Sequence, residues 1–81
     1  MRIDKYLKVS RIIKRRTVAN DACDTEHISV NGKPVKASYQ VKVGDVVEIT
    51  FGTRTLTVRV TDVRESVKKN EANLMYEVIS Q

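Results

Sequence analysis

Apolar residues recur with a helical period over the first third of the chain. Ile3 and Leu7 lie four residues apart, so we expect a short amphipathic helix over Arg2 to Ser10. A second helix is expected over Arg15 to Asp24, because four small or apolar residues repeat there at i, i+1, i+4 and i+5. These residues, which should face inward, are Val18, Ala19, Ala22 and Cys23.

From the end of the second helix onward the period changes to two, which is typical of strands that bury one face. Ile28 and Val30 lead into Asn31-Gly32, the strongest short signal for a hairpin, and the second arm is expected to run through Val35 to Ala37. Three more strands are expected to contain Val46 to Phe51, Leu56 to Val63 and Met75 to Ile79. The polar residues Ser66 to Asn73 are expected to form a loop.

This order of elements predicts an α+β fold, with two amino-terminal helices packed on a small antiparallel or mixed sheet of about five short strands. A chain of 81 residues has room for one modest core, so we expect a single domain over residues 1–81, with a core motif over 1–50 and a strand extension over 51–81. A small β-grasp domain would have similar strands. Sulfur carriers of that class end in a diglycine, whereas this chain ends in Ile79-Ser80-Gln81.

Positive charge is concentrated at one end of the chain, although the net charge is only +5. Residues 1–16 hold seven basic residues and one acid, and the remainder holds eight basic and nine acidic residues. This asymmetry is typical of a chain that presents one face to a polyanion. Three of the cations, Lys14, Arg15 and Arg16, lie at the start of the second helix, where the helix dipole disfavours them. That conflict indicates an external anion at this position.

Catalytic chemistry is not expected, because no nucleophile, base and orienting group can be assembled from the sequence. Cys23 is expected to be a small core residue, and His27, four residues away, cannot complete a metal site with it. We expect no cofactor and no metal. We also expect no membrane contact, since no apolar run approaches the roughly 20 residues that cross a bilayer. The expected location is the cytoplasm.

Four sequence runs, taken together, resemble the S-four RNA-binding domain, a family first named for small-subunit ribosomal protein four. The runs are Arg2 to Leu7, Lys14 to Ala19, Ile28 to Val35 and Val43 to Val47, and the resemblance covers residues 1–50. It implies the αL motif of that family, in which two helices present a basic face to structured RNA. Over its whole length the chain is similar to the small free-standing family members of bacterial ribosome-associated quality control.

That similarity implies binding to a large ribosomal subunit obstructed by peptidyl-tRNA. The expected partners are the large subunit, its 23S rRNA, the peptidyl-site tRNA and the elongation factor RqcH, whose alanine tailing the protein would support as a monomer. Three alternatives stay open: a heat-shock factor that recycles large subunits, a targeting or general structured-RNA module such as those attached to pseudouridine synthases, and a β-grasp interaction module.

The residues expected to contact RNA are basic and lie mainly in the two helices. They are Arg2, Lys5, Lys8, Arg11, Lys14, Arg15, Arg16 and Lys36. Asp4 is expected to orient a neighbouring arginine or to cap amides. Tyr6 could stack on a base or be buried beside Leu7; the sequence leaves both open.

The chain departs from the family pattern at both ends of the second helix. Family members commonly carry glycine where this helix ends, because a left-handed residue is needed there, but this chain has Thr25-Glu26-His27. Many members begin the helix with Ser-Arg, whereas this chain has Arg15-Arg16, so a serine cap should be missing.

Overall fold

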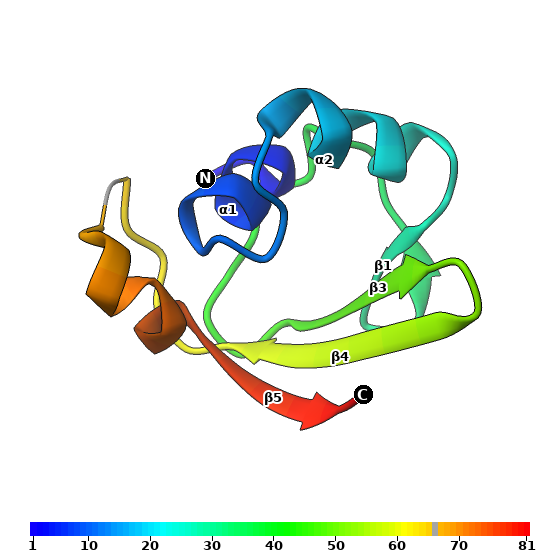
Figure 1. Cartoon of the computed structure of the whole chain (residues 1–81). Coiled ribbons are helices and arrows are strands. Elements are labelled where there is room, and N and C mark those ends of the chain that lie inside the picture. The colour runs from blue at the N-terminus through cyan, green and yellow to red at the C-terminus, as the bar shows by residue number, and fades with distance from the viewer. Residues whose placement is uncertain (66) are drawn as a thin grey trace.

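The computed structural model describes residues 1–65 and 67–81, in which two helices and a 3-10 helix lie beside a five-stranded sheet (Figure 1). In chain order the elements are α1 (Ile3–Val9), α2 (Arg16–Asp24), β1 (Ile28–Val30), β2 (Lys33–Pro34), β3 (Val46–Phe51), β4 (Arg54–Val60), η1 (Lys69–Met75) and β5 (Tyr76–Ser80). The predicted α+β class is confirmed. Within the described ranges, no helix is long and apolar enough to span a bilayer.

The strands form one antiparallel sheet in the order β2-β1-β3-β4-β5. Val47 of β3 pairs with Val30 of β1 on one side and with Val58 of β4 on the other. Because side chains alternate between the faces of a strand, this row of valines lies on one face and the neighbouring row lies on the other. The neighbouring row is polar and consists of Ser29, Glu48 and Thr57.

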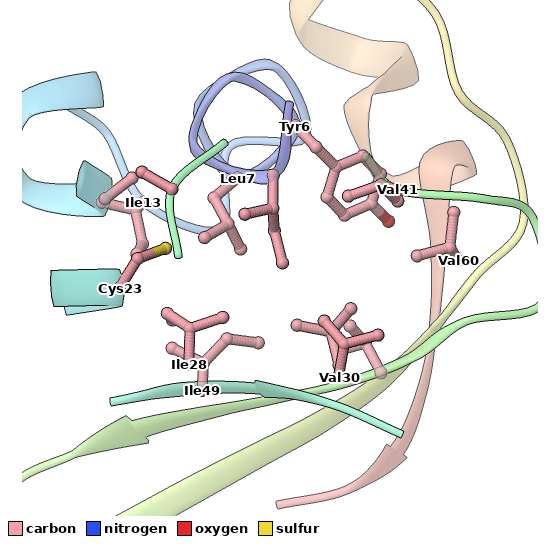
Figure 2. Packing of buried hydrophobic residues seen from close by; sticks show 14 of the residues in the cluster. Tyr6, Leu7, Ile13, Cys23, Ile28, Val30, Val41, Ile49 and Val60 are labelled. Carbon is pink, nitrogen blue, oxygen red and sulfur yellow. The ribbon is translucent and has the colours of Figure 1, made fainter. Parts of the chain in front are cut away.

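Both helices cover the apolar face of the sheet, and the core lies between them and the strands (Figures 1 and 2). α1 buries Ile3, Tyr6 and Leu7 completely, so the predicted stripe includes an aromatic ring as well. α2 buries Ala19 and Cys23, which are four residues apart, and it therefore meets the core along one narrow stripe.

The prediction that Val18 faces inward is wrong, because 50% of its surface is exposed. Val18 precedes Ala19 by one residue, which turns its side chain by about 100° around the helix. Since the fully buried residues of α2 are Ala19 and Cys23, and the partly buried Ala22 packs beside them, that turn carries Val18 toward solvent.

The carboxyl end of α2 has a left-handed residue, although the chain has no glycine there. Glu26 has a φ of 61°. Its N–H donates to the carbonyl of Cys23 (3.1 Å), and the N–H of His27 donates to the carbonyl of Ala22 (2.8 Å). These two bonds form a Schellman motif, in which glycine is the usual left-handed residue. Here a glutamate occupies that strained position.

The predicted Asn31-Gly32 hairpin is confirmed, with a φ of 52° at Asn31 and 84° at Gly32, as a tight primed turn requires. The Asn31 amide also donates to the carboxylate of Asp45 (3.2 Å), while its oxygen accepts the N–H of Val46 (3.0 Å). The hairpin turn and the Gly44-Asp45 turn are therefore bonded to each other, although they are far apart in the sequence.

The second arm of the hairpin is shorter than predicted, because β2 ends at Pro34 and not at Ala37. Beyond Pro34 the chain leaves the sheet and runs past the start of α1. There the carbonyl of Ala37 accepts the N–H of Asp4 (3.3 Å), and the carbonyl of Tyr39 accepts the N–H of Ile3 (2.8 Å). These carbonyls satisfy amides that have no partner inside the helix.

β4 is also shorter than predicted, since it ends at Val60 and Val63 lies outside it. The carboxylate of Asp62 accepts the N–H of Val63 (2.8 Å). A local bond of this kind competes with the ladder of a sheet and favours a turn. The alternation of apolar residues therefore continues past the point where the strand stops.

The polar segment from Ser66 to Asn73 is not entirely a loop, as η1 begins at Lys69. Ala72 and Met75 are both buried, and their spacing of three residues matches the three residues per turn of a 3-10 helix. Ser66 itself lies outside the described residues.

Candidate nucleic-acid interface

Asp4 lies in the first turn of α1 and is almost completely buried, with 1% of its surface exposed. Its carboxylate accepts the N–H of Lys5 (2.8 Å), one of the amides left without a helical partner. The guanidinium groups of Arg2 (3.2 Å) and Arg16 (3.4 Å) and the amide of Asn20 (3.4 Å) donate to the same carboxylate. One carboxylate thus joins the start of α1 to α2.

The donors around Asp4 keep it ionised. Burial by itself raises the pKa of this carboxyl, but the hydrogen bonds from Arg16, Asn20 and the Lys5 N–H, together with the charge of Arg16, outweigh burial and bring the pKa below its ordinary value. At neutral pH the two arginines are therefore held by a full negative charge.

Arg2 and Arg16 remain available to a ligand while they are held by Asp4, because 45% of each side chain is exposed. A guanidinium group has five N–H donors, so one or two bonds to Asp4 leave others free. Arg16 is also the first residue of α2, and its N-cap Arg15 makes no side-chain capping bond, as the sequence predicted. The unsatisfied amides at this helix start favour an anion.

Five of the predicted site residues line one open groove with a volume of about 960 Å³: Lys5, Lys8, Arg11, Lys14 and Arg16. We call it the basic groove. Lys5 and Lys8 project together because they are three residues apart on α1. Arg11 follows α1 with a φ of 63°, a conformation in the left-handed region. The two helices and their connector thus gather onto one surface the cations that the sequence spreads over residues 5–16.

The other predicted residues lie outside the basic groove. Arg2 lines a smaller neighbouring pocket of about 400 Å³ together with Asn20, and Arg16 lines both hollows. Arg15 and Lys36 are exposed, but neither is among the described residues that line these two hollows. Arg16 therefore has the central position.

The far side of the basic groove was missed by the sequence analysis. It is formed by Glu65, Val67 and Lys69, which we call the second wall. In Figure 1 this part of the chain, which follows β4 and leads into η1, lies beside α1. Glu65 forms an ion pair with Lys5. Lys69 precedes the buried Ala72 by one 3-10 turn, and this spacing is only a weak sequence signal that Lys69 belongs to the groove. No sequence pattern indicates Glu65, which reaches the groove only through tertiary contacts.

Three residues that the sequence left open or called structural are accounted for by burial and local bonds. Tyr6 is fully buried and donates its hydroxyl to the carbonyl of Met75 (2.8 Å), so the idea that it stacks on a base is wrong. Cys23 is buried in the core, and burial raises the pKa of its thiol to about 11, which keeps it protonated. His27 contacts the Thr25 hydroxyl through Nδ1 (2.6 Å).

Comparison with known proteins identifies the family. The model of the S4 domain family matches residues 1–47. Over the full chain, the RQC P-site tRNA stabilizing factor of Streptococcus pneumoniae is 56% identical, with 92% of its length covered, and that of Bacillus subtilis is 47% identical, with 94% covered.

Among solved structures, heat shock protein 15 of Vibrio cholerae, whose structure is trimeric, superposes with a TM-score of 0.91 at 23% identity. The match covers 99% of this chain and 82% of that one, and at this identity it establishes the shared fold. The matched residues and the full-length relatives together show that this chain belongs to the S4 domain family and, within it, to the RqcP group of RQC P-site tRNA stabilizing factors.

Proposed function

We propose that this protein is a non-catalytic RNA-binding factor of ribosome-associated quality control. It binds an obstructed large ribosomal subunit through 23S rRNA and the peptidyl-site tRNA, and thereby supports RqcH-driven alanine tailing of stalled nascent chains. It acts as a monomer in the cytoplasm, on the ribosome. The relatives that match the full chain are named for stabilizing tRNA in the P site, which supports this proposal.

The observation that carries the proposal is the basic groove. Within the described residues, six cationic side chains and a single carboxylate line it. RNA offers phosphates at regular spacing, so a rigid row of cations binds it by displacing counterions. Because the groove is open and lined mainly by cations, it suits recognition of the shape and backbone of a folded RNA better than the reading of base edges.

The chemistry of the groove favours binding over catalysis. Among the described residues, its lining consists of cations, two valines and Glu65, whose carboxylate is engaged by Lys5. Hydrolysis or group transfer would call for a nucleophile with a base beside it, or for two carboxylates with different pKa values. Positioning a tRNA, in contrast, needs only charge, shape and rigidity.

The experiment is sucrose-gradient sedimentation of lysates that contain stalled ribosomes, with the tagged wild type, Arg16→Ala and Arg59→Ala. Arg59 is a matched control because it is also a half-exposed arginine in an ion pair, with Glu77 at 3.6 Å, on the polar face of the sheet. We expect the wild type and Arg59→Ala to move with large subunits and peptidyl-tRNA, and Arg16→Ala to stay at the top.

Two other outcomes would change the proposal. If all three proteins stay at the top of the gradient, the ribosome is not the target, and free structured RNA or tRNA takes its place. If Arg16→Ala sediments with large subunits as the wild type does, binding occurs on a surface other than the basic groove.

A further inference from the structure

The second wall comes from a part of the chain that the S4 match does not include. That match ends at residue 47, whereas Glu65, Val67 and Lys69 follow β4. The groove therefore has one wall from the S4 part and one from the carboxyl-terminal extension. The extension does more than complete the sheet.

Glu65 has the position that a bound phosphate would need. It is the one carboxylate among the described residues that line the groove, and it is paired with Lys5 on the opposite wall. The side chain of Glu65 is 74% exposed, so the pair lies at the open side of the groove. The charge and hydrogen bond of Lys5 lower the pKa of the Glu65 carboxyl, which is therefore ionised at neutral pH. A carboxylate and a phosphate oxygen compete for a lysine through the same charge and the same N–H donors.

Lys69 gives the second wall a cation of its own. It is the first residue of η1, and the carbonyl of the last residue, the fully buried Met75, accepts the Tyr6 hydroxyl of α1. η1 is thus anchored to the core at its far end, and Lys69 is held opposite α1. The adjacent Lys68 is also exposed but is not among the residues that line the groove.

From these contacts we infer that the second wall takes part in RNA binding, with Lys69 as an RNA contact and Glu65 as an internal stand-in for a phosphate. In the free protein the Glu65 carboxylate is paired with the Lys5 ammonium group. When RNA enters, a phosphate displaces Glu65 from Lys5, and Lys69 binds the same backbone from the other side. The ion pair lowers the affinity of the empty groove for any polyanion. This inference rests on the proposed RNA binding of the groove.

The test measures the affinity of purified full-length protein for bulk tRNA at low and high salt. Glu65→Gln should bind about two- to fivefold more tightly at low salt, since an exposed pair of this kind opposes binding only weakly, and the gain should fade as salt screens the pair. Lys69→Ala should bind more weakly, and the slope of log affinity against log salt should become shallower by about 0.7 to 0.9.

The controls separate the second wall from net charge. Glu77→Gln removes the same charge as Glu65→Gln and also frees an arginine, but on the polar face of the sheet. Lys68→Ala removes the same charge as Lys69→Ala from the next residue. Both controls should bind tRNA as the wild type does. In a Lys5→Ala background, most of the gain from Glu65→Gln should disappear, because the lysine that it releases is missing.

Each contrary result overturns the inference. Equal gains from Glu65→Gln and Glu77→Gln would mean that bulk charge explains the effect. If Glu65→Gln binds tRNA more weakly than the wild type, Glu65 supports Lys5 and does not compete with a phosphate for it. If Lys69→Ala binds tRNA as tightly as the wild type, Lys69 is not an RNA contact. These results are independent of the sedimentation experiment, since tRNA affinity can respond to the second wall even if the protein does not bind large subunits.

Discussion

Asp4 is nearly inaccessible to solvent, although it lies in a surface pocket that two arginines also line. It holds the half-exposed Arg2 and Arg16 in place and satisfies the Lys5 amide. Holding a side chain before a ligand arrives reduces the rotamer entropy that binding has to overcome. We therefore expect Asp4 to matter both for stability and for the position of Arg16, even though an isolated acid at an RNA surface would oppose binding.

Replacing Asp4 with Asn should destabilise the fold in a pH-dependent way. The pKa of Asp4 in the folded protein is below its ordinary value, so its stabilising effect is present above the unfolded pKa of about 3.9 and is lost as pH falls through the folded pKa. At pH 7 the variant should lose about 1 to 3 kcal/mol, because a buried acceptor of several hydrogen bonds is replaced.

Urea unfolding followed by circular dichroism, repeated over a pH series, measures this effect. The difference between the wild type and Asp4→Asn should be largest at neutral pH and shrink below about pH 4. Asp21→Asn is a suitable control, since Asp21 is exposed on the same pocket. A difference that stays constant down to acidic pH would show that the ionised carboxylate is not what stabilises the fold.

Both ends of α2 lack the residue that usually caps a helix, and the two departures differ in their consequences. Its N-cap, Arg15, makes no side-chain bond to the helix, which leaves amides available near the basic groove. Its carboxyl end places Glu26 in the left-handed region, where an L-residue with a Cβ is strained. The first departure is compatible with anion binding, whereas the second lies away from both hollows and offers no such benefit.

Glu26→Gly should therefore stabilise the protein by about 0.5 to 1 kcal/mol, because relief of the left-handed strain exceeds the entropy that glycine adds to the unfolded chain. Thermal and urea unfolding measure the change. Glu26→Ala is the matched control, as it removes the same charge and most of the side chain but keeps the Cβ. If alanine stabilises the protein as much as glycine does, the charge of Glu26 is responsible and the backbone strain is not.

The elements were predictable wherever local pattern and tertiary environment agree. The spacing of Ile3 and Leu7 predicted α1, and Asn31-Gly32 predicted the hairpin, because a primed turn has a strong local preference for these residues. η1 was not predictable, because the burial of Ala72 and Met75 depends on tertiary packing and not on a local pattern.

The candidate site was predictable on one side only. Cations on α1 and at the start of α2 have helical spacing, so the sequence already places them on neighbouring faces. Lys36 was included because it is close to the hairpin in sequence, but the chain leaves the sheet after Pro34. Glu65 and Lys69 reach the groove through the fold, since 60 residues separate Glu65 from Lys5. The periodicity of a sequence cannot predict a contact between residues so far apart in the chain.

On the scale of the whole molecule, charge is separated between two faces. The basic groove lies on the side of α1, α2 and η1, while the outward face of the sheet carries a polar row and the Arg59–Glu77 pair. A polyanion is therefore attracted to the side of the protein that carries the basic groove. Such an arrangement orients the protein before contact.

RNA affinity should consequently depend steeply on salt. If the groove makes about five phosphate contacts, log affinity should fall with log salt at a slope of roughly −3.5 to −4.5. Fluorescence anisotropy with labelled tRNA over a salt series measures this slope. Arg59→Ala should leave it unchanged, whereas Arg16→Ala should make it shallower by about 0.7 to 0.9. A flat dependence for the wild type would rule out the electrostatic mechanism.

The bond between Tyr6 and Met75 also links α1 to the carboxyl-terminal extension. The carbonyl of Met75 accepts the Tyr6 hydroxyl from α1 and the N–H of Thr61 (3.0 Å), so three distant parts of the chain meet at one buried atom. Without the residues after β4, a fully buried hydroxyl would lose its acceptor, which is costly in an apolar core. We therefore expect the S4-matched residues and the extension to gain and lose their structure together, as one cooperative unit, so that the two walls of the basic groove appear in the same folding step.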